Sequence, residues 1–287
     1  DNKLINIHVS SQNMTYFIRI KTNEVNIDYA IDGGQVKVLI LNDFMGDVLI
    51  NDSGYVKNHG KLEITYIDLN KFNYNQVSHV DVYQDSILNI TSKYLAINNK
   101  VIKMDYINRE KYSEINIDNS CVALDNSDFL LECIGKIEKG AKTSKNHQKS
   151  RCLIIDKPKR SNIQPILLID ENDVEASHSL SSGTIDQDVL YYLNSRGISY
   201  KQAMILLIHS YLLIDEEILN EYGLDQSILD ELNLTQEALA KRLGKSRSHI
   251  TNMLGLLSLP DDIQKDVKAG GSGPVCSGLV MFSYIYQ

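Results

Sequence analysis

The chain of 287 residues is long enough for two domains and for a sizeable hydrophobic core. Its formal net charge of -8 argues against a broadly basic surface, so any nucleic-acid binding must be confined to a local patch. A hydrophobic fraction of 43%, no signal-peptide pattern and no apolar run of roughly 20 residues predict a cytoplasmic protein that does not enter a membrane. The chain begins at Asp1 and not at methionine, which indicates a trimmed start or the edge of a fragment.

The four cysteines are irregularly spaced and form neither a CxxC pair nor a zinc-ribbon pattern. This usage predicts reduced cytosolic thiols. Cys152 alternates with apolar neighbours and is expected to pack in the core rather than react, and Cys121 and Cys133 have the same interpretation. Cys276 is assigned no role.

Short β-prone runs recur through the first 170 residues, from Ile5–Val9 to Leu153–Ile155. Clusters of Asn, Asp, Gly, Ser and Lys separate them and favour turns, by local hydrogen bonds or by positive φ. Helical periodicity is absent. Two architectures fit, a β-sandwich and a solenoid whose strands stack in parallel. The asparagine-rich strands favour the solenoid, but no strict repeat period is visible, so the sandwich stays open.

A change of architecture is expected between Asp173 and Gly197. An extended segment carrying His178 leads into a turn of small residues, Ser181 to Gly183, and then into a helix with an apolar stripe. Thr184 or Asp186 can cap the start of this helix, and Gly197 lies where a left-handed C-cap is needed.

Residues 150–214 carry a specific signature. It comprises a proline-containing strand (Gln164–Ile169), Asp173-Val174, Ala176-Ser177-His178, Gly183, Ile185-Asp186, Leu190-Tyr191-Tyr192-Leu193 and Ser195-Arg196-Gly197-Ile198. The run resembles the SufB/SufD family, and SufD more than SufB. The resemblance implies a mainly β protein, with a right-handed parallel β-helix over residues 1–184 followed by a C-terminal α-helical region over 185–232. It also implies a non-enzymatic cytoplasmic scaffold for iron–sulfur cluster assembly. Such a scaffold pairs with a SufB-like subunit, or with a second copy of itself, and docks a SufC-like ATPase.

His178 matches the family's functional histidine. The resemblance therefore implies that it is a metal ligand of a transient iron–sulfur cluster shared with a partner subunit. An imidazole on a rigid surface suits such a cluster. The alternative is a partly buried histidine that binds a backbone carbonyl. Two departures bear on the site: Ser179 to Ser182 replace the usual residues after this histidine, and Ser150 stands where SufB carries its key cysteine. No GxxxxGK[ST] loop is present, so the chain is not the ATPase.

Two helical segments are expected after Gly197. Ser199 and Gln202 form a capping box at the start of the first. The segment 213–231 then carries seven acidic residues and no Lys or Arg. Its acidic face is either a docking surface for the ATPase or a solvated face.

The segment Leu234–Pro260 has the spacing of a helix-turn-helix, with Ala240 in the first helix, Gly244 at the turn and Ile250 in the second helix. It resembles the helix-turn-helix of ParB-type partition proteins, which predicts a DNA-binding segment over residues 233–268. The candidate DNA-binding residues are Thr235, Gln236, Lys245, Ser246, Arg247, Ser248, His249 and Asn252. The nucleotide-binding segment that precedes this motif in ParB proteins is missing.

The join between the two resemblances leaves three interpretations open: an authentic fusion, a chimeric gene, or a helical pair recruited for its shape. Residues 269–287 resemble neither family and stay unassigned. Sequence-specific DNA binding of the chromosome-partition type is therefore the alternative function.

Overall fold

The computed structural model describes residues 3–155, 157–185 and 187–200, together with residues 203, 208, 211 and 212. The chain divides into two compact units, one made of Asp1–Val189 with Ile214–Leu224 and the other of Leu190–Leu213 with Asp225–Gln287. The expected helix-turn-helix, its eight candidate DNA-binding residues and the tail from 269 to 287 lie outside the described residues.

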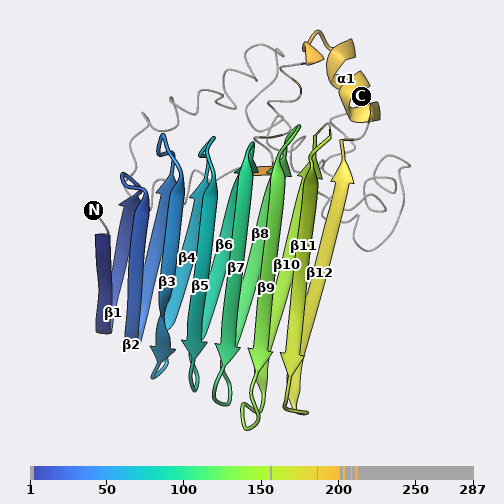
Figure 1. Cartoon of the computed structure of the whole chain (residues 1–287). Coiled ribbons are helices and arrows are strands. Elements are labelled where there is room, and N and C mark those ends of the chain that lie inside the picture. The colour runs from blue at the N-terminus through green and yellow to red at the C-terminus, as the bar shows by residue number, and fades with distance from the viewer. Residues whose placement is uncertain are drawn as a thin grey trace. The chain divides into compact units, whose positions relative to one another are not determined.

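Twelve strands build the first unit (Figure 1). They are β1 (Lys3–Arg19), β2 (Glu24–Asn42), β3 (Val48–Lys57), β4 (Lys61–Asp68), β5 (Tyr74–Val82), β6 (Ile87–Ala96), β7 (Asn99–Asn108), β8 (Glu114–Ala123), β9 (Asp128–Ile137), β10 (Ser144–Ile154), β11 (Arg160–Ile169) and β12 (Val174–Thr184). Every pairing between them is parallel. A sandwich of hairpins requires antiparallel pairs, so the described strands decide in favour of the solenoid.

The strand order is that of a flattened solenoid. β2 is long enough to pair with β3 along Glu24–Asp32 and with β4 along Gln35–Asn42. From there, odd-numbered strands stack on one side up to β11 and even-numbered strands stack on the other up to β12, which gives a β-solenoid of the right-handed type with about 7 turns. Register partners are 26 residues apart between Ile50 and Gln76 but 32 apart between Leu131 and Ile163. These unequal turns explain why the sequence shows no strict period.

The core is built by alternation along each strand. In β6 and β9, every second residue is buried and its neighbours are partly exposed, as expected when side chains point alternately into and out of a solenoid. Inward residues of successive turns are register partners, so they form rows along the solenoid axis. One such row is aliphatic over most of its length, and it contains Val38, Ile64, Ile90 and Ile117.

Several turns use residues that tolerate positive φ. Asn58, Asp85 and Asn126 adopt φ values of 54° to 60° between successive strands, as the Asn and Asp clusters predict. Gly34, inside β2, has φ of +74°, and a Cβ there would overlap the backbone of Gln12 in β1. This position therefore requires glycine for two independent reasons.

A helix follows the last strand, as expected from the sequence. α1 spans Gln187–Ser195 and buries Leu190 and Leu193, and Gly197, two residues after its last residue, has φ of +83°. Thr184 is the last residue of β12, and Asp186 lies outside the described residues, as does Gln202 of the expected capping box. Within the described part of the chain, no helix is long and apolar enough to cross a membrane.

Candidate functional site

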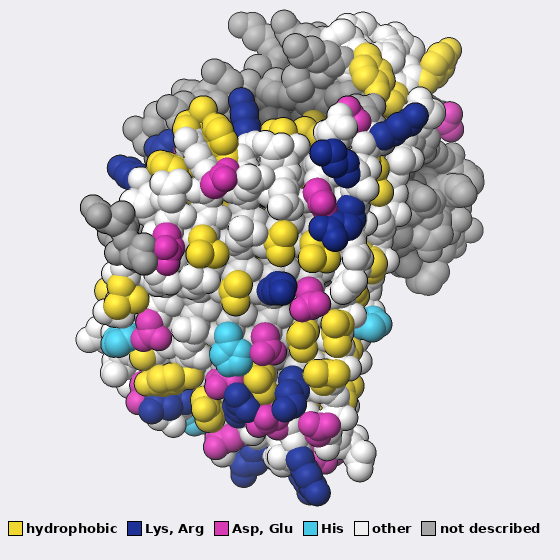
Figure 2. Space-filling model, in the orientation of Figure 1, with side chains coloured by type: hydrophobic (Ala, Val, Ile, Leu, Met, Phe, Trp, Pro, Cys, Tyr) yellow, Lys and Arg dark blue, Asp and Glu magenta, His cyan; other side chains and the backbone are white. Residues whose placement is uncertain are grey.

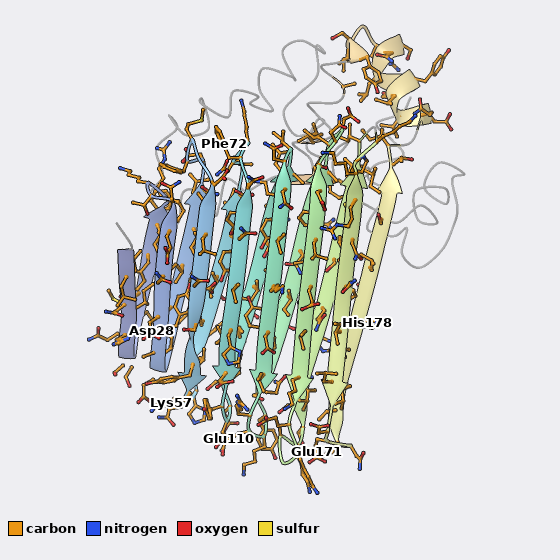
Figure 3. All side chains as sticks on the ribbon, viewed as in Figure 1. Asp28, Lys57, Phe72, Glu110, Glu171 and His178 are labelled. Carbon is orange, nitrogen blue, oxygen red and sulfur yellow. The ribbon has the colours of Figure 1, made fainter. Side chains whose placement is uncertain are left out.

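His178 lies on β12, the last strand of the even-numbered side (Figure 3). Its register partner is Gln148 of β10, whose side chain is buried in the interior. Because directly paired residues of a parallel ladder lie on the same face of the sheet, His178 occupies the inward row of the terminal turn. It is nevertheless exposed, since no described strand pairs with β12 beyond it. Among the described residues it has no hydrogen-bond partner.

The inward side chains of β10 next to His178 are polar. Gln148 donates through Nε2 to the carbonyl oxygen of Ile166 in β11 at 3.1 Å, and Asn146 donates through Nδ2 to Asn108 Oδ1 at 3.0 Å. Both side-chain oxygens, Gln148 Oε1 and Asn146 Oδ1, are buried without a partner in the described part of the chain. Gly135 makes room for the two amides, because a Cβ there would lie 2.5 Å from Gln148 Nε2. The inward face next to His178 therefore has unused acceptor capacity.

Three cysteines lie in the interior and none is exposed, as expected from the sequence. Cys121 of β8 and Cys152 of β10 are direct register partners, and Cys152 Sγ lies 3.2 Å from Ser161 Oγ. A hydrogen bond from Cys121 lowers the pKa of the Cys152 thiol to about 7, whereas burial raises the pKa of Cys121. Burial also raises the pKa of Cys133 to about 12. Cys152 is therefore core-packed as predicted, but more readily ionised than a buried thiol usually is.

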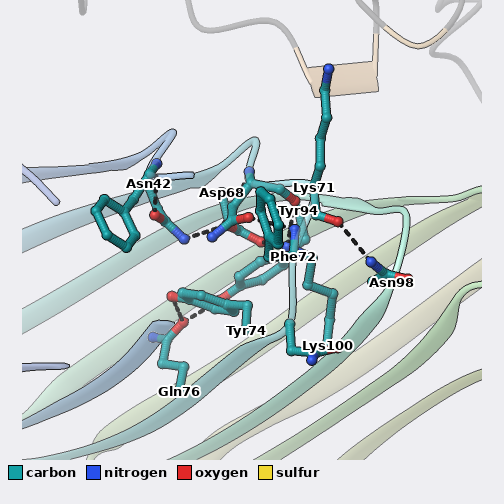
Figure 4. A network of polar contacts seen from close by, with 12 residues as sticks. Asn42, Asp68, Lys71, Phe72, Tyr74, Gln76, Tyr94, Asn98 and Lys100 are labelled. Atoms are coloured by element: carbon teal, nitrogen blue, oxygen red, sulfur yellow. Dashed lines mark hydrogen bonds and ion pairs between the residues drawn. The ribbon is translucent and has the colours of Figure 1, made fainter. Parts of the chain in front are cut away.

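Cys152 and Cys121 belong to an inward row of register partners. Toward the start of the solenoid, this row continues with Tyr94, Asp68 and Asn42. Asp68 accepts a hydrogen bond from Lys100 Nζ at 2.7 Å, and both side chains are at most 1% exposed (Figure 4). Asn42 Nδ2 also donates to Asp68 at 2.7 Å. Burial raises the pKa of Asp68 to about 6 although the ammonium opposes this shift, and burial lowers the pKa of Lys100. The row therefore contains both thiols and the acidic member of a buried ion pair. The alternation of residues in the sequence does not indicate this ion pair.

A second buried network lies nearer the start of the solenoid. Asp52 of β3 accepts hydrogen bonds from the hydroxyl groups of Tyr66 and Ser78, and Ser78 lies 2.9 Å from the Tyr106 hydroxyl. No cation contacts this carboxyl group among the described residues, and burial raises its pKa to about 6.

The outer face of the solenoid carries both signs of charge. Figure 2 shows Lys and Arg side chains interspersed with Asp and Glu, and no basic patch dominates the visible face. Charged side chains also pair between neighbouring turns, such as Arg109 with Asp81 at 2.8 Å and with Glu138 at 2.7 Å. This face does not provide the local basic patch that nucleic-acid binding requires.

The described residues do not form a complete cluster site. They contain no group of three or more His, Cys, Asp or Glu side chains that could hold a metal ion. His178 supplies one exposed imidazole. Cys152 is the register partner of Ser182, which lies four residues after His178 on β12. An iron–sulfur cluster generally needs several protein ligands. The described donor set therefore fits one ligand of a cluster and requires the others from elsewhere.

Comparison with known families gives two matches that together span most of the sequence. The SufBD core domain of the SUF system for iron–sulfur cluster assembly matches residues 12–211, well over half of the chain. The ParB helix-turn-helix domain matches residues 217–271.

Similar proteins fall into the same two groups. The chain is 44% identical over 91 residues to the iron–sulfur cluster assembly protein SufD of Bacillus subtilis, covering 32% of this chain and 21% of SufD. It is 54% identical over 57 residues to stage 0 sporulation protein J of the same organism, covering 18% of this chain and 20% of that protein. An iron–sulfur cluster assembly SufBD family protein of Mycobacterium bovis is 31% identical over 100 residues, which cover 34% of this chain and 12% of that protein. The matched segments thus span about a fifth, or less, of each relative's length.

Proposed function

This chain belongs to the SufBD family of the SUF system for iron–sulfur cluster assembly, and from that premise we propose that it acts as a SufD-like scaffold subunit. The observation that carries the proposal is the position of His178, an exposed imidazole on the inward row of the terminal turn. The similarity to SufD of Bacillus subtilis supports the choice of SufD over SufB. On this proposal the chain is not an enzyme and works in the cytoplasm.

The cluster is the cargo of this scaffold, and His178 contributes one of its ligands. The described residues contain no group of three or more His, Cys, Asp or Glu side chains that could hold a metal ion, and on this proposal a partner subunit provides the thiolates. A rigid strand suits this role, because the ladder between β10 and β12 fixes the backbone on both sides of the histidine from Ser144–Val174 to Ile154–Thr184.

A SufB-like subunit is the proposed partner at the terminal turn, with a second copy of this chain as the alternative. Within the described residues, one edge of β12 and one edge of β11 have no strand partner, and such edges add a strand from another chain. Leu168, Ile169 and Leu180 on these strands are 46% to 47% exposed. Their burial would add apolar area to the backbone pairing.

A SufC-like ATPase is the proposed partner of the helical region 185–232. The sequence contains no ATP-binding loop of its own. The acidic segment 213–231 is the proposed docking surface and lies outside the described residues. The divisions after residues 184, 232 and 268 are part of this proposal.

Co-purification tests the assignment. The full chain is expressed with tagged SufB-like and SufC-like subunits and recovered through the SufB tag. The proposal predicts a stable complex containing this chain. A variant that adds two positive charges to β12 (Ser177→Lys with Ser179→Lys) is expected to leave the complex. Recovery of SufB and SufC without this chain would contradict the proposal.

The match of residues 217–271 to the ParB helix-turn-helix domain supports sequence-specific DNA binding as a second function. Fluorescence anisotropy with a palindromic partition-type duplex and a scrambled duplex tests it. Binding is expected to prefer the palindrome, to weaken with salt, and to be lost in Arg247→Ala but retained in Arg151→Ala. Equal binding of both duplexes would rule out a sequence-specific function.

A further inference from the structure

Cys121 and Cys152 form a thiol pair to which the scaffold role assigns no part. They are direct register partners in the ladder between β8 and β10, and each is 1% exposed. Neighbouring strands of a sheet are about 4.7–4.9 Å apart, which lies within the range of about 4.4–6.8 Å between the Cα atoms of a disulfide. Because paired residues project to the same face, both sulfur atoms lie side by side in the interior.

Small polar residues lie between this pair and the end of the solenoid. Ser182 of β12 is the next register partner of Cys152 and is exposed, and Ser161 of β11 contacts the Cys152 sulfur at 3.2 Å. Cys133 differs on each count. It lies in the odd-numbered strand β9, its register partners are Met104 and Pro165, and neither carries a thiol. The described part of the chain therefore offers one adjacent thiol pair and one isolated thiol.

We propose that Cys121 and Cys152 form a reversible disulfide when hydrogen peroxide oxidises them near the end of the solenoid. The Cys152 thiolate attacks one oxygen of hydrogen peroxide, the O–O bond breaks, and the second oxygen leaves as water after taking up a proton. The resulting Cys152 sulfenic acid is attacked by the Cys121 sulfur, which loses its proton as the S–O bond breaks and a second water leaves. Two thiols are oxidised and one peroxide is reduced to two waters.

The roles of the two sulfur atoms follow from their hydrogen bond. Cys121 donates to Cys152, so Cys152 loses its proton first, with a pKa lowered to about 7. Cys121 then acts as the resolving thiol, which protects Cys152 from irreversible oxidation to the sulfinic acid. The disulfide joins the two turns behind the strand that carries His178.

Peptide mapping of the full chain tests this proposal in a Cys276→Ser background. The folded protein is treated with hydrogen peroxide, denatured, alkylated and digested with trypsin without reduction. Cys121 and Cys133 lie in the same peptide between Lys111 and Lys136. Cys133→Ser is therefore the matched control that identifies the linked sulfur atom.

The expected result is a linked peptide pair with loss of two free thiols, unchanged in Cys133→Ser and reversed by dithiothreitol. In Cys121→Ser, Cys152 is expected to proceed to the sulfinic acid. Three results would overturn the proposal: a link through Cys133, sulfinic acid at Cys152 of the parent protein without any link, or no oxidation in the folded chain. The parent protein alone decides the matter if Cys121→Ser does not fold.

Discussion

His178 and Gln148 are register partners in the ladder between β12 and β10, yet one is exposed and the other is 3% exposed. The difference arises because β10 is covered by β12, whereas no described strand pairs with the other edge of β12. A position that is part of the core in the turns from Val38 to Gln148 thus becomes an accessible position in the last one. The solenoid places a polar side chain on a rigid strand at its own end.

The buried ion pair between Lys100 and Asp68 is expected to be essential for stability. Lys100→Met leaves the Asp68 carboxylate buried without its cation, which we expect to cost about 3–5 kcal/mol of unfolding free energy. Urea denaturation followed by circular dichroism measures this loss. In the double variant with Asp68→Asn, much of the stability should return.

Lys145→Met is the matched control for this experiment. Lys145 pairs with Glu175 at 3.1 Å, but the two side chains are 42% and 65% exposed. Solvent screens such a pair, so the denaturation midpoint should barely move. Equal destabilisation by both variants would show that burial of the Lys100 pair has no special importance.

Asp52 predicts a particular pH dependence. Its pKa in the folded protein is raised to about 6 by burial, above the usual value of 3.8. The protonated form is therefore favoured by folding, and its contribution to stability is present below about pH 4 and is lost as the pH rises through about 6. Asp52→Asn keeps the shape and cannot ionise. Between pH 4 and pH 7, the wild type should lose about 1–3 kcal/mol relative to the variant.

Denaturation of both proteins at several pH values gives this difference. All other titrating groups, including Asp68, are common to the two proteins, so their contributions cancel. Parallel stability curves across this range would contradict a raised pKa for Asp52.

Gly135 is expected to be indispensable for packing beside His178. A methyl group at this position would clash with the Asn146 and Gln148 amides. Gly135→Ala should therefore destabilise the fold by about 1–3 kcal/mol, measured by urea denaturation. Gly183→Ala, on β12, is the control, because a Cβ there meets no atom within 4 Å. If the two variants are equally stable, the interior at Gly135 is less tightly packed than the structure indicates.

Much of the solenoid could be predicted from alternation, but not its polar end. The sequence does not predict a strand over the first residues of β10, from Ser144 to Ser150. Their inward positions are Ser, Asn, Gln and Ser, so the alternation of aliphatic and polar residues is missing there. The expected run Leu153–Ile155 marks only the end of this strand. The choice between sandwich and solenoid also requires the pairing, since both produce the same alternation.

The candidate site could be predicted only as a single residue. The family signature points to His178, but its place on the inward row depends on the register with Gln148. The Lys100–Asp68 pair joins residues 32 positions apart, and nothing local to either residue predicts that contact. Cys121 and Cys152 each look like ordinary core residues in the sequence, and only the parallel register brings them together.

The role of His178 as a cluster ligand is tested most directly by anaerobic cluster reconstitution. The full chain and a SufB-like subunit are incubated with iron and sulfide, and bound cluster is quantified by visible absorption and iron content. His147→Ala is the matched control, since His147 lies on β10 in the outward row and contacts Ser177 at 2.8 Å. We expect that His178→Ala loses most of the cluster, several-fold or more, while the subunits still associate and His147→Ala behaves as wild type. An unchanged cluster yield in His178→Ala would contradict it.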